Sequence, residues 1–309
     1  MRISTSWAQQ LSVNAMLDQQ SRLQQTQMQL STQKRILTAS DDPAAAARII
    51  DLNQSLKQTG QYHSNINAAR DRLSMEDGVL QSATDILQRI HELGVQGMSG
   101  TNTANSRTAA AAELDALNGQ LLNLANTKNA NGEYMFSGLK STTQPFSKDA
   151  GNPGAYDYVG DANSRLIQID MGRQVTDSDP GTSVFGVPTG PSPATVPAPG
   201  SINNIFEAIN KLSTDLKANA PSAASLGDIS KALDNVTLTR ASVGARLNAL
   251  DNQESINSAT ALNIQTTLSA TQDLDYAEAV SRFTQQTASL QAAQQTFTQV
   301  KKLSLFNYL

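Results

Sequence analysis

The sequence predicts a mainly α-helical protein whose N- and C-terminal segments form a long antiparallel helical bundle or coiled coil, with a small β-rich insert in the middle. Three observations support this fold class. Apolar residues recur at helical spacing over long stretches at both ends, the period changes to two residues near the middle, and prolines gather after that change. Because helices bury similar apolar faces most simply against each other, we expect the two ends of the chain to pair.

The first predicted helix covers about residues 5–37 and carries one narrow apolar seam. Its large apolar residues recur every seven positions: Met16, Leu23, Leu30 and Leu37. This spacing is typical of a helix that pairs with another helix. Between residues 3 and 33 the only charged side chains are those of Asp18 and Arg22. A free-standing surface helix normally carries more charges and ion pairs, so we interpret this helix as packed on several sides.

The last predicted helix begins near residue 226, pauses near 273–275 and continues to about residue 305. Its end repeats the seven-residue spacing and adds two apolar positions: Phe283, Leu290, Phe297, Val300 and Leu303. No charged residue occurs between 283 and 300. We therefore predict that these five residues, together with the four seam residues of the first helix, form an assembly interface between copies of the chain.

A second long helix is predicted to begin at Pro43, after an N-cap at Asp42, and to end between residues 94 and 100. A third runs from residue 105 or 106 to the turn-rich residues 126–132. The seam of the second helix contains apolar and small residues but also Glu76. We expect five leucines of the long helices to form an ordinary core within the chain: Leu73, Leu80, Leu87, Leu247 and Leu250.

In the middle of the chain, alternation of apolar and polar residues predicts short strands. Tyr134 and Phe136 alternate with other residues as in one strand of a hairpin, and further alternation covers residues 156–158 and 166–171, with a turn at 160–164. Residues 186–200 hold five of the ten prolines, which predicts an extended loop. A helix then resumes at Ser201, and one of its faces carries four large apolar residues: Ile205, Phe206, Ile209 and Leu212.

These elements predict three parts. Residues 1–42 with 270–309 are expected to form a terminal coiled-coil polymerisation region. Residues 43–142 with 201–269 are expected to form a helical rod domain with a hairpin, and residues 143–200 a small outward-facing β-rich insert with the proline-rich loop.

Composition argues against several classes of function. The net charge of −4 makes nucleic acid an unlikely partner, and no apolar run is long enough for membrane insertion. The chain has no cysteine, and the zinc-protease pattern that starts at His91-Glu92 fails because position 95 is Val95. His63 lies in the helical seam, where a hydrogen-bonded histidine is more common than a ligand. We predict no enzyme activity, no catalytic residue, no metal and no cofactor.

Several segments, in their order along the chain, resemble one protein family. They are Met1-Arg-Ile-Ser-Thr5, Ser31-Thr-Gln-Lys-Arg35-Ile36, Ser40-Asp-Asp-Pro43, Leu121-Leu-Asn-Leu-Ala-Asn-Thr127, Asn131-Gly-Glu-Tyr-Met-Phe-Ser-Gly138, Thr143-Gln-Pro-Phe146, Val243-Gly-Ala-Arg-Leu-Asn248 and Leu303-Ser-Leu-Phe306. With these, the chain resembles the flagellin-like axial proteins of bacterial flagella over about residues 1–146 and 201–309. One departure is Gln33, which stands where the family commonly has glycine, so the sequence leaves open whether the first helix breaks there.

The resemblance implies a structural subunit that is exported unfolded through the flagellar apparatus and assembles outside the cell. Within the family, the chain is similar to the members that join the hook to the filament as a short helical ring; the alternative is a filament-forming flagellin. The implied partners are further copies of the chain in a homo-oligomer, the first hook-associated protein, flagellin and a flagellar export chaperone. We also expect the chain ends to be disordered in an isolated monomer, because uncharged single helices are marginally stable.

Overall fold

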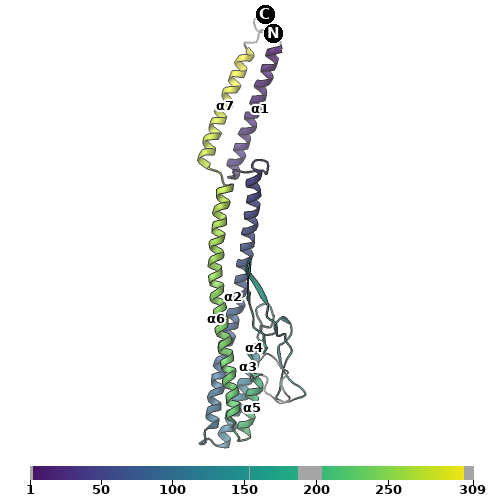
Figure 1. Ribbon diagram of the computed structural model, residues 1–309, viewed down its shortest axis with the longest axis vertical. Helices are drawn as coiled ribbons and strands as arrows, with labels where there is room; N and C mark the ends of the chain where they lie inside the picture. The colour runs from purple at the N-terminus through teal and green to yellow at the C-terminus, as the bar shows by residue number, and fades with distance from the viewer. Residues whose placement is uncertain (1–2, 153, 187–203, 303–309) are drawn as a thin grey trace. The chain divides into compact units, whose positions relative to one another are not determined.

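The computed structural model describes residues 3–152, 154–186 and 204–302 (Figure 1). The chain forms two compact units, and each contains segments from both halves of the sequence. Unit 1 comprises Met1–Thr59 and Ala259–Leu309, and unit 2 comprises Gly60–Ser258. In the described ranges, no helix has an apolar stretch that could cross a bilayer.

Unit 1 contains α1 (Ile3–Thr32), the start of α2 (Pro43–Met98), the end of α6 (Ala223–Gln272) and α7 (Tyr276–Lys302). Helices α1 and α7 lie side by side and run antiparallel (Figure 1). The expectation that the two ends of the chain pair is therefore confirmed.

Helix α1 ends earlier than the sequence predicts. It stops at Thr32, and Gln33 adopts a left-handed backbone conformation with φ of 60°. The predicted continuation to Leu37 is therefore wrong, and Leu37 lies in the loop that follows the helix. Two backbone N–H groups in this loop, those of Leu37 and Thr38, donate to the carboxylate of Asp41 at 3.0 and 2.9 Å. These hydrogen bonds lower the pKa of Asp41 below its ordinary value, and the bond from the N–H of Thr38 has the largest effect.

The break after α1 is hydrogen-bonded to the break before α7. The N–H of Arg35 donates to the carbonyl of Gln272 at 2.8 Å, and the N–H of Leu274 donates to the carbonyl of Gln33 at 3.1 Å. The Arg35 guanidinium adds a bond to the carbonyl of Thr271 at 3.0 Å. The predicted pause near residues 273–275 is confirmed. The hydrogen bonds between the two breaks pair backbone N–H and C=O groups that a helix end otherwise leaves without a partner.

The start of α2 agrees with the sequence. Asp42 caps the helix, since its Oδ1 accepts a hydrogen bond from the N–H of Ala45 at 3.0 Å, and Pro43 occupies the first helical position. Helix α3 (Ala104–Ala125) begins slightly before the predicted position because Thr103 caps it by accepting from the N–H of Ser106.

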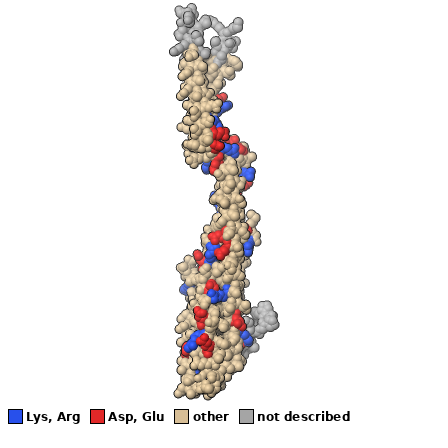
Figure 2. Space-filling model, turned by 90° about the vertical axis from the view of Figure 1, so that its left-hand side faces the viewer, with Lys and Arg blue, Asp and Glu red and all other residues tan. Residues whose placement is uncertain are grey.

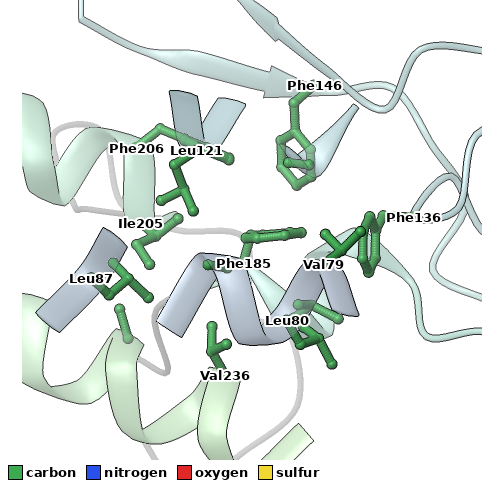
Figure 3. Packing of buried hydrophobic residues seen from close by; sticks show 14 of the residues in the cluster. Val79, Leu80, Leu87, Leu121, Phe136, Phe146, Phe185, Ile205, Phe206 and Val236 are labelled. Carbon is green, nitrogen blue, oxygen red and sulfur yellow. The ribbon is translucent and has the colours of Figure 1, made fainter. Parts of the chain in front are cut away.

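Unit 2 holds the main core, between the rest of α2, α3, α5 (Ile205–Lys217) and the first part of α6. The predicted core leucines are confirmed, since all but the half-buried Leu247 are fully buried: Leu73, Leu80, Leu87 and Leu250. The four apolar residues of α5 are also fully buried. Figure 3 shows part of this core, in which side chains of α2, α3, α5 and α6 meet.

The short strands form two separate antiparallel pairs. Strand β1 (Phe146–Lys148) pairs with β2 (Tyr156–Tyr158), and β3 (Leu166–Asp170) pairs with β4 (Arg173–Thr176). The segments predicted at 156–158 and 166–171 are thus strands. They belong to different sheets, and each pairs with a segment that the alternation did not reveal.

The strand predicted around Tyr134 and Phe136 is wrong. Tyr134 forms an isolated bridge with Lys128, and Phe136 is buried instead in a cluster of aromatic rings. The Phe136 ring lies edge-on to Phe185 with the centroids 5.1 Å apart (Figure 3). The backbone carbonyl of Phe136 accepts a hydrogen bond from the N–H of Gly181 at 2.8 Å. Gly181 is the first residue of the short helix α4 (Gly181–Val184). Tertiary packing, rather than a sheet, explains the apolar residue at this position.

Candidate assembly surface

The candidate functional site is the terminal helix pair, which we define as α1 and α7 of unit 1. These helices enclose a shallow groove of about 300 Å³, lined by Val13, Met16, Leu17, Gln20, Leu290, Gln294, Phe297 and Thr298. The groove brings together three of the predicted assembly residues, Met16, Leu290 and Phe297, within a single chain. The two seven-residue seams therefore face each other, as heptad seams of paired helices do.

The predicted seam residues are only partly buried by this pairing. On α1 these half-buried residues are Met16, Leu23 and Leu30, and on α7 they are Phe283, Leu290 and Phe297. Leu37 is half-buried in the loop after α1. Val300 belongs to α7, but its side chain lies outside the described residues, as does the whole of Leu303. Each seam therefore keeps apolar surface that a single chain does not cover.

A second apolar face of α1 was missed by the sequence analysis because its members do not follow the seven-residue seam. Its exposed members are Trp7, Leu11 and Met28; Leu17 is also exposed but lines the groove with α7. At 3.6 residues per turn they lie about 100° or more around the helix from the seam. Trp7 is 67% exposed. Trp7 and Leu11 lie one turn apart, and exposed apolar side chains that adjoin in this way are a feature of interaction surfaces.

The surface of the terminal helix pair carries few charges. Asp18 and Arg22 are the only charged residues of α1, and the first turns of α7 hold Glu278 and Arg282, which form an ion pair at 2.7 Å. On the face shown in Figure 2, most of this part of the surface is tan, and Lys, Arg, Asp and Glu appear along one edge and at its lower end. Covering such a surface requires little desolvation of charge, which favours close packing against other helices.

Two buried polar side chains of α1 lie near the helix breaks. Thr26 and Gln29 are both buried; the Thr26 hydroxyl donates to the carbonyl of Arg22 at 3.0 Å, and the Gln29 amide donates to the carbonyl of Arg35 at 2.7 Å. Ile36 and Ala279 are the buried hydrophobic residues of unit 1 within the described ranges. The best-packed part of the terminal helix pair is therefore its end near the breaks.

Among the described residues, no group of three or more His, Asp or Glu residues could hold a metal ion. His63 is half-buried and lies 4.0 Å from the carboxylate of Glu254, near the Ser258 hydroxyl, which matches the prediction of a hydrogen-bonded histidine. The half-buried apolar seams and few charges of the terminal helix pair suit packing against further helices.

Comparison with known proteins first defines the class. The bacterial flagellin N-terminal helical region matches residues 3–141, and the bacterial flagellin C-terminal helical region matches residues 226–309. These two matches contain α1 and α7. The pair of sparsely charged terminal helices is therefore of the flagellin type.

Two curated relatives narrow the class. Flagellar hook-associated protein 3 of Escherichia coli (strain K12) is 33% identical over 318 aligned positions that cover 99% of this chain and 99% of the relative. Flagellar hook-associated protein 3 of Salmonella typhimurium is 30% identical with the same coverage. The chain belongs to the family of flagellar hook-associated protein 3.

Solved structures agree with this assignment at the level of the fold. The chain is similar to a putative flagellar hook-associated protein from Vibrio parahaemolyticus, with a TM-score of 0.65 and 23% identity over 75% of this chain and 100% of that one. It is also similar to a flagellar junction protein from Legionella pneumophila, with a TM-score of 0.59 and 22% identity over 74% of this chain and 100% of that one.

Proposed function

We propose that this protein is a structural adaptor of the bacterial flagellum that joins the hook to the filament. The observation that carries this proposal is the alignment with the hook-associated relatives over nearly the whole length of both chains. A filament-forming flagellin is the second candidate, because a flagellin of Bacillus subtilis aligns over 98% of this chain, although at 25% identity. The higher identity to the hook-associated relatives favours the junction.

The proposed mechanism is assembly of many copies into a short helical ring through the terminal helix pair. The half-buried seams and the exposed apolar face of α1 support it, because both leave apolar surface uncovered in a single chain. The proposed interface consists of the nine residues predicted from the sequence: Met16, Leu23, Leu30, Leu37, Phe283, Leu290, Phe297, Val300 and Leu303. We add the exposed α1 residues Trp7, Leu11 and Met28 as a second contact face.

The proposed partners follow from a position between hook and filament. They are copies of the same chain, the first hook-associated protein on the hook side and flagellin on the filament side. The proposed route is export of the unfolded chain through the flagellar apparatus, assisted by a chaperone. The sparse burial of unit 1 supports this route, because helices with few buried side chains unfold at little cost. No catalytic step is part of the proposal.

The division into parts also remains a proposal. In it, residues 1–42 with 270–309 polymerise, residues 43–142 with 201–269 form the supporting helical body, and residues 143–200 face outward. The breaks after Thr32 and before Tyr276 support a terminal part that is distinct from α2 and α6.

Electron microscopy of a strain that lacks this protein tests the position in the flagellum. We expect intact hooks without attached filaments, and filaments released into the medium, since flagellin is still made but has no junction to grow on. Hooks that still carry filaments would contradict the junction role. Filaments that fail to form at all, with no flagellin released, would favour the second candidate.

Substitutions in the terminal helix pair test the mechanism. Leu23→Asp and Leu290→Asp place a charge in the seams, and we expect soluble, folded protein that is no longer incorporated into flagella. Leu11→Asp changes only the exposed face of α1, so its loss of incorporation would assign that face to contacts between copies. The matched control is Leu238→Asp, an exposed leucine of unit 2. Swimming and antibody labelling of flagella measure the result. Motile cells with Leu23→Asp or Leu290→Asp would refute the seam assignment.

A further inference from the structure

Glu76 is a buried carboxyl group of unit 2 that plays no part in the proposed function. It belongs to α2, it is 1% exposed, and its Oε1 accepts a hydrogen bond from the backbone N–H of Asp179 at 3.3 Å. Its Oε2 is buried and forms no hydrogen bond with the described residues. A carboxylate in such a place has lost its water without gaining full replacement, so the neutral acid is strongly favoured.

The chain segment that contacts Glu76 is residues 177–186, which we call the latch segment. It follows β4 and contains α4. Several bonds attach it to its neighbours: the N–H of Gly181 donates to the carbonyl of Phe136 at 2.8 Å, and the side-chain amide of Asn235 on α6 donates to the carbonyls of Ser183 and Val184 at 2.7 and 3.0 Å. Phe185 is fully buried in the aromatic cluster. The latch segment therefore closes one side of the core.

Two charged groups face Glu76 from the elements packed against it. Asp179 comes from the latch segment and Arg246 from α6, and they form an ion pair with each other in which both side chains are largely buried. Asp179 opposes a negative charge on Glu76 and Arg246 favours one. Other charged groups that join the same elements pair among themselves. In the latch segment, the buried Asp177 pairs with Arg72 of α2 and with Arg165, and Asp77 of α2 pairs with Arg240 of α6.

Burial is the largest influence on this carboxyl group. Together with the repulsion from Asp179, and against the attraction of Arg246, burial raises the pKa of Glu76 from its ordinary value of 4.5 to about 8. At neutral pH Glu76 is therefore mostly protonated when the latch segment is closed. If the segment opens and water reaches the carboxyl group, its pKa returns toward the ordinary value and the proton is released.

We propose that Glu76 is a proton-controlled latch: its neutral form holds residues 177–186 closed against α2 and α6, and its ionisation loosens them. An ionised Glu76 is stabilised by water, which it gains only when the latch segment lifts. The closed state binds one proton more than the open state between pH 4.5 and about 8. Each pH unit in that window therefore favours opening roughly tenfold, and the effect levels off above the window.

This inference is independent of the proposed function, because it concerns how firmly one segment of unit 2 is held. It has a consequence for folding. A chain that folds at neutral pH takes up a proton at Glu76, since the unfolded carboxyl group is ionised at that pH. The assembled protein would hold the latch segment more tightly in neutral than in alkaline medium.

Hydrogen exchange of the full-length protein tests the latch between pH 6 and 9, after correction for the intrinsic pH dependence of exchange. We expect opening of residues 177–186 to increase roughly tenfold per pH unit up to about pH 8 and then level off. In Glu76→Gln, which stays neutral, we expect no such increase. The matched control Glu92→Gln changes an exposed carboxylate of the same helix and should keep the wild-type slope.

A second measurement does not depend on the variant. Carbon-13 NMR of the Glu76 carboxyl group in the wild-type protein should give a titration midpoint near pH 8. A midpoint between pH 4 and 5 would overturn the proposal. The same pH slope of exchange in Glu76→Gln as in the wild type would also overturn it, because another group would then control the opening.

Discussion

Unit 1 and unit 2 contain parts of the same two long helices, α2 and α6, yet they bury their apolar residues very differently. In unit 2, residues of α2, α3, α5 and α6 form one contiguous core with residues of the segment between α3 and α5. This core contains fully buried leucines and phenylalanines. None of the described residues of unit 1 belongs to that core, and the seams of α1 and α7 are half-buried.

Helical spacing alone does not determine how much a seam is buried. A helix with one partner covers only a narrow stripe, whereas a helix with several partners covers most of its circumference. In unit 2, α3 and α5 provide the additional partners. In the described part of unit 1, α1 and α7 have mainly each other. If the protein assembles as proposed, other copies provide the missing partners.

The largest expected difference between the units is in hydrogen exchange of the monomer. We expect core amides of α2 and α6 in unit 2 to open only with global unfolding, at about 5–15 kcal/mol. For α1 and α7 we expect opening free energies below about 2 kcal/mol, because few buried contacts hold them. Mass spectrometry of dilute protein measures both. Strong protection of residues 5–32 in a dilute monomer would contradict the view that these helices lack partners.

The next largest effect is expected from removing an aromatic ring of unit 2. Phe206 is fully buried, and its ring lies 5.0 Å from that of Phe146, between centroids. We expect Phe206→Ala to lower the free energy of unfolding by about 3–5 kcal/mol, since a large cavity remains. Urea denaturation measures the change. The matched control is Tyr276→Ala at the start of α7, where the ring is exposed and the expected change is within about 0.5 kcal/mol. Equal effects at the two positions would remove the contrast between the units.

A smaller effect, of opposite sign, is expected at the end of α1. Gln33 has a left-handed backbone, which costs a residue with a β-carbon about 1–2 kcal/mol. Gln33→Gly relieves this cost but loses more chain entropy on folding, so we expect a net stabilisation of about 0.5–1 kcal/mol. The amides of Arg35 and Leu274, which bond across the two helix breaks, should then exchange a few-fold more slowly. Gln33→Ala keeps the β-carbon and should give no such slowing; an equal gain in both variants would point away from backbone strain.

Local features of the sequence predicted much of the fold. The Asp42 cap and Pro43 gave the start of α2, the four apolar residues of α5 gave its buried face, and the seven-residue seams gave the pairing of α1 with α7. These predictions succeeded because capping and periodic burial depend on residues a few positions apart. Six of the nine predicted interface residues lie in the seams of this pair, half-buried as a two-helix contact leaves them.

Other features depended on contacts between distant residues. Helix α1 ends at Thr32 although Gln33 lacks the freedom of glycine, because the neighbouring breaks exchange hydrogen bonds between residues 33–35 and 272–274. Phe136 joins an aromatic cluster instead of a strand because Phe146, Phe185 and Phe206 gather from three separate segments. Spacing along the chain carries no information about such partners.

The amino-acid pattern is sufficient to specify a set of long, paired, sparsely charged helices with a small β-rich insert, because a repeated apolar position needs only its own helix to define a face. Which faces stay uncovered, as with Trp7 and Leu11, and which polar groups are enclosed, as with Glu76, depends on the tertiary structure. Burial and the charge of a neighbour are properties of where distant segments meet. Glu76 occupies an ordinary position in a helical seam until Asp179 and Arg246 are brought beside it.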